Sequence, residues 1–269
     1  WSVGEKVHYL PDIPKGYLFK YNPANQLITY YETPYRVSCV IMTQSGEIWL
    51  LGVTTILIFN PESEQFSDYY DVNGTNVMKE KTANYGLESK DSMIWIGTDN
   101  GLLRIDPKIR QSKVFTKKEN VEGFGLTSNN ILTIHEAPDA KLWLGTHGGG
   151  INIFDPKTGN IEILTKEDGL ANNSVCGIVR ETNGNYWFST FNGLSFLDKQ
   201  NGTFQNFFPS DGFSHHEFNR FSFFQDSRQR LFFGGLNGFN MFRSEDLLKA
   251  KPKHHLFLSG IKNHLILEA

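Results

Sequence analysis

Short apolar segments alternate with polar turns along the whole chain, and the alternation repeats about every 46 residues. The clearest copies read WIGTDNGLLRIDP at 95–107 and WLGTHGGGINIFDP at 143–156. In each, a short apolar run leads into a Gly-rich turn, and a second run ends in Asp-Pro. Runs bounded by Gly, Pro, Asn and Asp are typical of β-strands, whereas no segment shows the apolar spacing of an amphipathic helix. The pattern predicts an all-β protein.

Every tryptophan of the chain falls on this period. The five tryptophans, and a phenylalanine in the next equivalent place, lie 44 to 48 residues apart: Trp1, Trp49, Trp95, Trp143, Trp187 and Phe232. Around them the turn signals divide each unit into four short strands, which is the signature of propeller blades. The sequence therefore predicts a β-propeller of four-stranded antiparallel blades. The tryptophan on the second strand is expected to fill the space between neighbouring blades.

About six blade motifs are present, and the one at Trp1 lacks its first strand. An open ring leaves unpaired sheet edges, so either the ring closes on fewer blades or a missing blade lies outside the sequence. We expect the second alternative: residues 1–250 form part of a seven-bladed ring, and the missing blade lies outside the sequence.

Composition narrows the class of partner. Of the 269 residues, 39% are hydrophobic and 20% charged, and the net charge is −3. The sequence contains no run of basic residues, so nucleic acid is not an expected partner. No stretch of about 18 apolar residues is present, so membrane attachment is expected only through segments outside this sequence. Cys39 and Cys176 fall on first strands three blades apart, too far for a disulfide, and two buried free thiols are expected.

The repeated motif resembles the two-component regulator propeller repeat. It consists of an apolar strand, a polar turn, W-[IL]-G-T, a Gly-rich turn, a second apolar strand and Asp-Pro, and it covers residues 1–245. The run EFNRFSFFQDSRQRLFFGGLNGFNMF at 217–242 is similar to the closing blade of that family, and 251–269 resembles a linker and the start of a following immunoglobulin-like sandwich. The resemblance implies the periplasmic sensor of a Bacteroides-type hybrid two-component system. Its inner-membrane anchor and histidine kinase would lie outside the sequence.

Candidate binding residues are those that break the repeat, because turn geometry does not require them. In a propeller, the turns between second and third strands and the connections between blades gather on one face. His147 and Phe191 are irregular residues of such turns, the second as an exposed ring, and the connection 212–220 is unusually rich in polar groups. An insertion at 5–16 also interrupts the first blade. The expected ligand-binding residues are His8, Tyr9, Asp12, His147, Phe191, His215, His216, Glu217 and Arg220.

Aromatic rings combined with amides, acids and guanidinium groups are typical of carbohydrate sites, since a sugar presents an apolar face and a fringe of hydroxyls. An oligosaccharide or another small ligand is therefore the expected partner, and a homodimer is possible. No cofactor and no metal are expected, because the adjacent His215 and His216 would point to opposite sides of an extended chain.

Three functions are weighed. The first is an extracytoplasmic module that senses oligosaccharide fragments and signals to the kinase, without catalysis by this segment. The second is a propeller enzyme of lyase or glycosidase type, which needs a coherent acid–base set that only the 212–220 connection could supply. The third is a non-catalytic scaffold for protein interaction, which would expose a large apolar patch.

Overall fold

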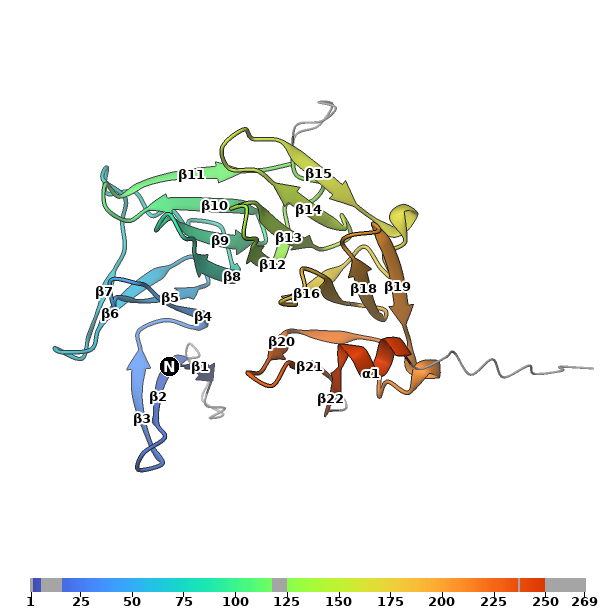
Figure 1. The fold of residues 1–269 in the computed structure, drawn as a ribbon. Coiled ribbons are helices and arrows are strands. Elements are labelled where there is room, and N and C mark those ends of the chain that lie inside the picture. The colour runs from blue at the N-terminus through green and yellow to red at the C-terminus, as the bar shows by residue number, and fades with distance from the viewer. Residues whose placement is uncertain (1, 6–15, 118–124, 237, 250–269) are drawn as a thin grey trace, which may run out of the picture.

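The computed structural model describes residues 2–5, 16–117, 125–236 and 238–249, and places their strands in six antiparallel sheets. The first and last sheets have three strands and the other four have four. Figure 1 shows the sheets following one another around a common centre, with the first strand of each complete sheet innermost. The predicted all-β propeller is confirmed. The blade number of the intact ring stays a prediction.

The strands follow the sequence in order. The first sheet holds β1 (Ser2–Glu5), β2 (Gly16–Asn22) and β3 (Leu27–Thr33), and the second holds β4 (Val37–Met42), β5 (Ile48–Gly52), β6 (Ile56–Asn60) and β7 (Gln65–Asp68). The third holds β8 (Ala83–Glu88), β9 (Ile94–Thr98), β10 (Gly101–Asp106) and β11 (Gln111–Phe115). In the fourth lie β12 (Ile131–Glu136), β13 (Leu142–Thr146), β14 (Ile151–Phe154) and β15 (Ile161–Leu164).

The fifth sheet holds β16 (Val175–Arg180), β17 (Tyr186–Thr190), β18 (Leu194–Asp198) and β19 (Thr203–Phe207), and the sixth holds β20 (Phe218–Gln225), β21 (Arg230–Gly235) and β22 (Gly238–Arg243). Two 3-10 turns, Lys166–Asp168 and Pro209–Asp211, precede the connections to the fifth and sixth sheets. A helix, α1 (Ser244–Lys249), follows β22. The sequence pattern does not predict this helix, since six residues are too few to show an apolar period.

The tryptophan rings fill the space between sheets, as predicted. Trp49, Trp95, Trp143 and Trp187 are at most 3% exposed. Each packs toward the sheet that follows: the Trp143 ring stacks on Tyr186 at 4.1 Å between centroids, and the Trp187 ring meets Phe242 edge-on at 5.0 Å. Trp1 lies outside the described residues. Phe232 is only partly buried, because no further sheet packs on it among the described residues.

A β-bulge interrupts the inner strand of the second to fifth sheets at equivalent positions. The bulged residues are Ser38, Asn84, Leu132 and Cys176. The polar ones reach the inner strand of the next sheet: Ser38 Oγ donates to the Ala83 carbonyl at 2.9 Å, and Asn84 Nδ2 donates to the Ile131 carbonyl at 3.0 Å. Sequence reasoning missed these links, which tie neighbouring blades near the axis.

Departures from the repeat are compensated by the neighbouring strand. Ser189 replaces the usual glycine of the second strand, and its register partner on β16 is Gly177. A Cβ at Gly177 would lie 2.4 Å from Ser189 Oγ, so a small residue is needed on one of the two strands.

Cys176 is fully buried and Cys39 partly buried; both are free, as predicted. Burial raises the pKa of Cys39 to about 11 and that of Cys176 to about 12.

Candidate functional site

The turns between second and third strands, together with the connections between sheets, form one face of the ring, here called the turn face. Backbone hydrogen bonds join its parts across sheet boundaries: Gly150 N–H donates to the Asn173 carbonyl at 2.8 Å, and Gly193 N–H donates to the His216 carbonyl at 2.7 Å. The second-strand threonines Thr98, Thr146 and Thr190 are fully buried and close the turns by donating to a backbone carbonyl. The repeated residues of this face are therefore structural.

The sixth sheet departs most from the repeat. Between the pairs Phe218↔Gly235 and Phe223↔Phe233, residues 219–222 of β20 stand opposite the single residue Gly234. Phe221 takes a left-handed φ of 60°, a conformation that a bulky side chain rarely adopts. Such local strain is common at binding sites, where the surrounding structure maintains it.

This wide bulge carries Arg220 and Phe221 to the third sheet. Arg220 Nη1 donates to Asn84 Oδ1 at 2.9 Å, and Phe221 stacks on Tyr85 with 6.1 Å between ring centroids. Asn84 Nδ2 in turn donates to Asn130 Oδ1 at 2.8 Å. We call these five residues the axial cluster, since they join the inner strands of the third and sixth sheets and the fourth sheet's connection.

The axial cluster presents groups that a sugar can use. Arg220 is exposed and Phe221 is 45% exposed, whereas Asn84 is 5% exposed and holds the arginine in place. Burial raises the pKa of Tyr85 to about 12, so its phenol is neutral and able to donate a hydrogen bond. A guanidinium beside an exposed ring suits a hydroxylated ligand with an apolar face.

His147 and Phe191 lie next to each other on the turn face, although 44 residues separate them in the sequence. Their rings meet edge-to-face at 5.8 Å, and His147 is exposed. Phe191 is partly buried and packs against the core around Trp187, so the expectation of an exposed ring is wrong. The packing follows from the apolar side chains beside this turn, since the same cluster includes Phe213 of the connection to the sixth sheet and Phe218 of β20.

The neighbours His215 and His216 lie in different environments, as expected for adjacent residues of an extended chain. His215 is 8% exposed and packs over Gly235, where a Cβ would lie 2.0 Å from its Nε2. Burial lowers the pKa of His215, which keeps the ring neutral. His216 and Glu217 are exposed on the turn face. The side chains available for binding there are thus His147, His216, Glu217 and Arg220, with His215 as a packing residue.

The predicted residues His8, Tyr9 and Asp12 lie outside the described residues. The insertion that carries them joins β1 to β2, whose ends pair at Glu5↔Gly16. The residues that sequence reasoning missed on this face are Asn84 and Tyr85, while Asn130 was expected to have only a structural role in its turn. No sequence signal identifies this cluster, because these residues occupy ordinary repeat positions and are brought together by the bulge of β20.

The opposite face is formed by the turns between first and second strands, and these turns are nearly identical in five sheets. Each opens six positions before the tryptophan or its substitute, and the opening residue's N–H donates to the carbonyl four residues on. The opening residues are Thr43, Ser89, Ala137, Glu181 and Asp226. Four of the five are polar, and Ala137 alone is not.

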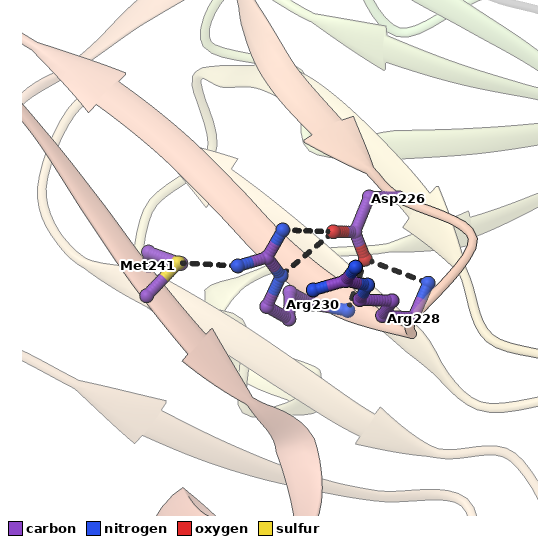
Figure 2. A network of polar contacts seen from close by, with 4 residues as sticks. All are labelled: Asp226, Arg228, Arg230 and Met241. Atoms are coloured by element: carbon purple, nitrogen blue, oxygen red, sulfur yellow. Dashed lines mark hydrogen bonds and ion pairs between the residues drawn. The ribbon is translucent and has the colours of Figure 1, made fainter.

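In the last of these turns, Asp226 organises two arginines (Figure 2). Its carboxylate accepts hydrogen bonds from the Arg228 and Arg230 backbone and forms a 2.7 Å ion pair with the Arg230 guanidinium, which also donates to Met241 Sδ at 3.8 Å. Desolvation raises the pKa of Asp226, but these hydrogen bonds and the Arg230 charge together outweigh it and lower the pKa. In the fifth sheet, Ser244 of α1 bridges Trp187 Nε1 and Glu181 Oε2 at 3.2 Å each, which fastens the helix to the ring.

A cavity of about 520 Å³ opens on this opposite face between the fourth and fifth sheets. Its lining includes Ala137, Lys141, Trp143, Arg180, Tyr186 and Lys199, a set here called the Trp143 groove. Sequence reasoning missed it, and the available signal was the alanine at a position that is polar in the other turns. Its size is in the ordinary range of ligand pockets.

Two other classes of site are not seen in the part of the chain that the structure describes. No three His, Cys, Asp or Glu residues gather there as metal ligands would. None of the helices in the described ranges is long and apolar enough to cross a membrane.

Comparison with known proteins gives a family model, a curated relative and several similar solved structures. Residues 1–115 match the family described as the SMP-30/Gluconolactonase/LRE-like region. A curated relative, histidine kinase P4 of Formosa agariphila, is 26% identical over 211 residues, which is 76% of this chain but 14% of the relative. The chain thus spans about one seventh of that protein.

The similar solved structures include two from bacterial proteins. The extracellular domain of the putative hybrid two-component system BT4673 from B. thetaiotaomicron has a TM-score of 0.66 and 18% identity, covering 86% of this chain and 31% of that one. PorZ, a surface component of the type-IX secretion system of Porphyromonas gingivalis, has a TM-score of 0.66 and 13% identity, covering 90% of this chain and 38% of its own. At these identities the likeness shows the fold.

Proposed function

We propose that this chain is part of an extracytoplasmic, periplasmic ligand-sensing module of a two-component regulator, and that it signals to a histidine kinase elsewhere in the same protein. The curated histidine kinase relative and the extracellular domain of the putative hybrid two-component system support this proposal. Catalysis by this segment is not part of it. The anchor, kinase and any homodimer contact belong to the proposal, since the chain spans only a fraction of those proteins.

The observation that carries ligand sensing is the contact between Arg220 and Asn84. It joins the inner strands of the third and sixth sheets, so a ligand bound to Arg220 acts on both ends of this arc of blades at once. A sensor needs such a place, because a ligand shifts a conformational equilibrium only by binding its two states differently. The exposed guanidinium, the half-exposed Phe221 ring and the nearby His147 and Phe191 favour an oligosaccharide as that ligand.

Calorimetry with a panel of oligosaccharides tests this function. A ligand found in the panel should bind the Arg220→Gln variant about tenfold or more weakly, since a hydrogen bond to a charged group contributes about 1.5–3 kcal/mol. The matched control is Arg228→Gln, an exposed arginine of the same sheet on the opposite face. Unchanged binding after combined loss of Arg220, Phe191 and His147 would contradict the proposed site.

An enzyme is the second candidate, favoured by the match of residues 1–115 to a family model whose description includes gluconolactonase. The same panel separates the two, because an enzyme consumes the saccharide whereas a sensor returns it unchanged. Silence across a broad panel would instead favour the interaction scaffold.

A further inference from the structure

The indole N–H groups of the buried tryptophans differ in their hydrogen-bond acceptors from one interface between sheets to the next. Trp49 Nε1 donates to Glu47 Oε2 at 3.2 Å, and Trp95 Nε1 donates to Ser89 Oγ at 3.2 Å. Trp187 Nε1 donates to Ser244 Oγ, again at 3.2 Å. Each acceptor belongs to the protein, which is expected because an unpartnered buried N–H costs about 1–3 kcal/mol.

Trp143 has no such acceptor among the described residues. The position that Ser89 occupies for Trp95 is Ala137, which has no polar side-chain atom. The position that Glu47 occupies for Trp49 is Lys141, whose ammonium can only donate. Trp143 is only 3% exposed, but its Nε1 atom is not completely buried. Because Trp143 lines the groove, this N–H is accessible from it.

Positive charge gathers around this open donor. The Lys199 ammonium lies 5.2 Å from the centre of the Trp143 ring, and the Arg180 guanidinium lies 6.0 Å from the centre of the stacked Tyr186 ring. Neither these two nor Lys141 forms an ion pair within the described part of the chain. The Lys141 ammonium interacts electrostatically with the Asp155 carboxylate, so Lys199 and Arg180 are the cationic donors of the groove that have no anionic partner in the described part of the chain.

Two of the carboxylates that line the groove already accept hydrogen bonds from the protein. Both oxygens of Asp198 accept hydrogen bonds within their own turn, from Gln200 and Asn201, and these bonds lower its pKa. Asp139 accepts the Lys141 backbone N–H. Glu162 on β15 is exposed at the edge of the groove and is free to accept from a ligand hydroxyl.

We propose that the Trp143 groove binds a small organic carboxylate that also carries hydroxyl groups, as an acidic sugar does. The carboxylate accepts from the Trp143 N–H and from Lys199 or Arg180, and the hydroxyls donate to Glu162. The groove lies on the face opposite the axial cluster, so this binding site is separate from the one that includes Arg220.

Indole N–H signals of nitrogen-15-labelled protein test the site directly. Trp143→Phe identifies the signal, which should shift saturably with D-glucuronate, while the Trp95 signal stays in place because Ser89 holds its N–H. D-glucose and acetate should each shift it at least tenfold less efficiently, since each offers half of the recognised chemistry. A response to glucose equal to that to glucuronate, or no saturable shift at all, would overturn the proposal.

Two variants sharpen the test. Lys199→Gln should weaken glucuronate binding about tenfold, whereas Lys113→Gln, which removes a lysine placed similarly over Phe115 outside the groove, should not. Ala137→Ser should restore the internal acceptor seen at Ser89 and abolish the shift while leaving the melting temperature intact. Unaltered binding by folded Ala137→Ser would contradict the role of the open N–H. Failure here leaves binding at Arg220 untouched.

Discussion

The interface around Trp95 and the interface around Trp143 have the same strand pairing and differ at several repeat positions, two of which set their polarity near the indole ring. The strand partner of Trp95 is Leu87, and its turn opens with Ser89; the strand partner of Trp143 is His135, and its turn opens with Ala137. The Trp95 interface thus has an apolar strand partner, and the Trp95 N–H has an acceptor within the protein. The other carries a partly buried histidine, His135, whose Nε2 is buried, and it leaves the Trp143 N–H without an acceptor among the described residues, beside a cavity. Exchanging a polar for an apolar residue, or the reverse, at these positions changes the hydrogen bonding of the buried ring without changing the fold.

The largest expected effect is the loss of stability when either tryptophan ring is removed, which tests whether both rings stabilise the fold by packing. Trp95→Ala and Trp143→Ala should each lower the free energy of unfolding by about 3–5 kcal/mol, with Trp143→Ala at the lower end because an accessible cavity already adjoins it. Chemical denaturation gives both values. A loss below about 1 kcal/mol for Trp143→Ala would show that its interface is not packed as described.

An intermediate effect should come from pH. Burial, then Arg180 and Lys90, lowers the pKa of His135 from 6.5 to about 4. The unfolded chain therefore binds more protons than the folded one between these values, so stability is complete above pH 6.5 and falls as the pH is lowered toward 4. The loss attributable to His135 is at most about 3 kcal/mol.

Denaturation midpoints of wild type and His135→Leu at several pH values measure this loss. The variant places at the Trp143 interface the residue type that Leu87 provides at the Trp95 interface. It should flatten the profile between pH 6.5 and 4 and leave any contribution of His215, whose pKa is also lowered, in place. An unchanged profile would mean that His135 does not cause the acid sensitivity.

The smallest effect concerns the indole N–H alone. Trp95→Phe removes a hydrogen bond to Ser89, whereas Trp143→Phe removes none within the described protein. Trp95→Phe should therefore cost about 1 kcal/mol more than Trp143→Phe. Equal costs in paired denaturation curves would contradict the contrast between the two interfaces.

Much of the fold could be predicted because its signals are local and repeated. The tryptophan period predicts the blades, and the Asn-Pro and Asp-Pro positions become turns in which the side-chain oxygen accepts backbone N–H groups, as Asp106 does from Lys108 and Ile109. On the turn face, His147 and Phe191 meet as their positions in adjacent blades suggest. Helix α1 escaped prediction because its position depends on Ser244 reaching Trp187 rather than on a sequence period.

The sequence by itself determined the blade architecture, the burial of the described tryptophans and the separation of Cys39 from Cys176, since each follows from residues at one fixed spacing. Only the tertiary structure decided that residues 219–222 bulge far enough for Arg220 to reach Asn84, and that the Trp143 N–H opens to a cavity. Both depend on contacts between sheets, where the partner of a side chain lies far away in the sequence. The repeat specifies which positions of the blades are equivalent. Where the residues at such positions differ, contacts between neighbouring sheets determine the role of each residue.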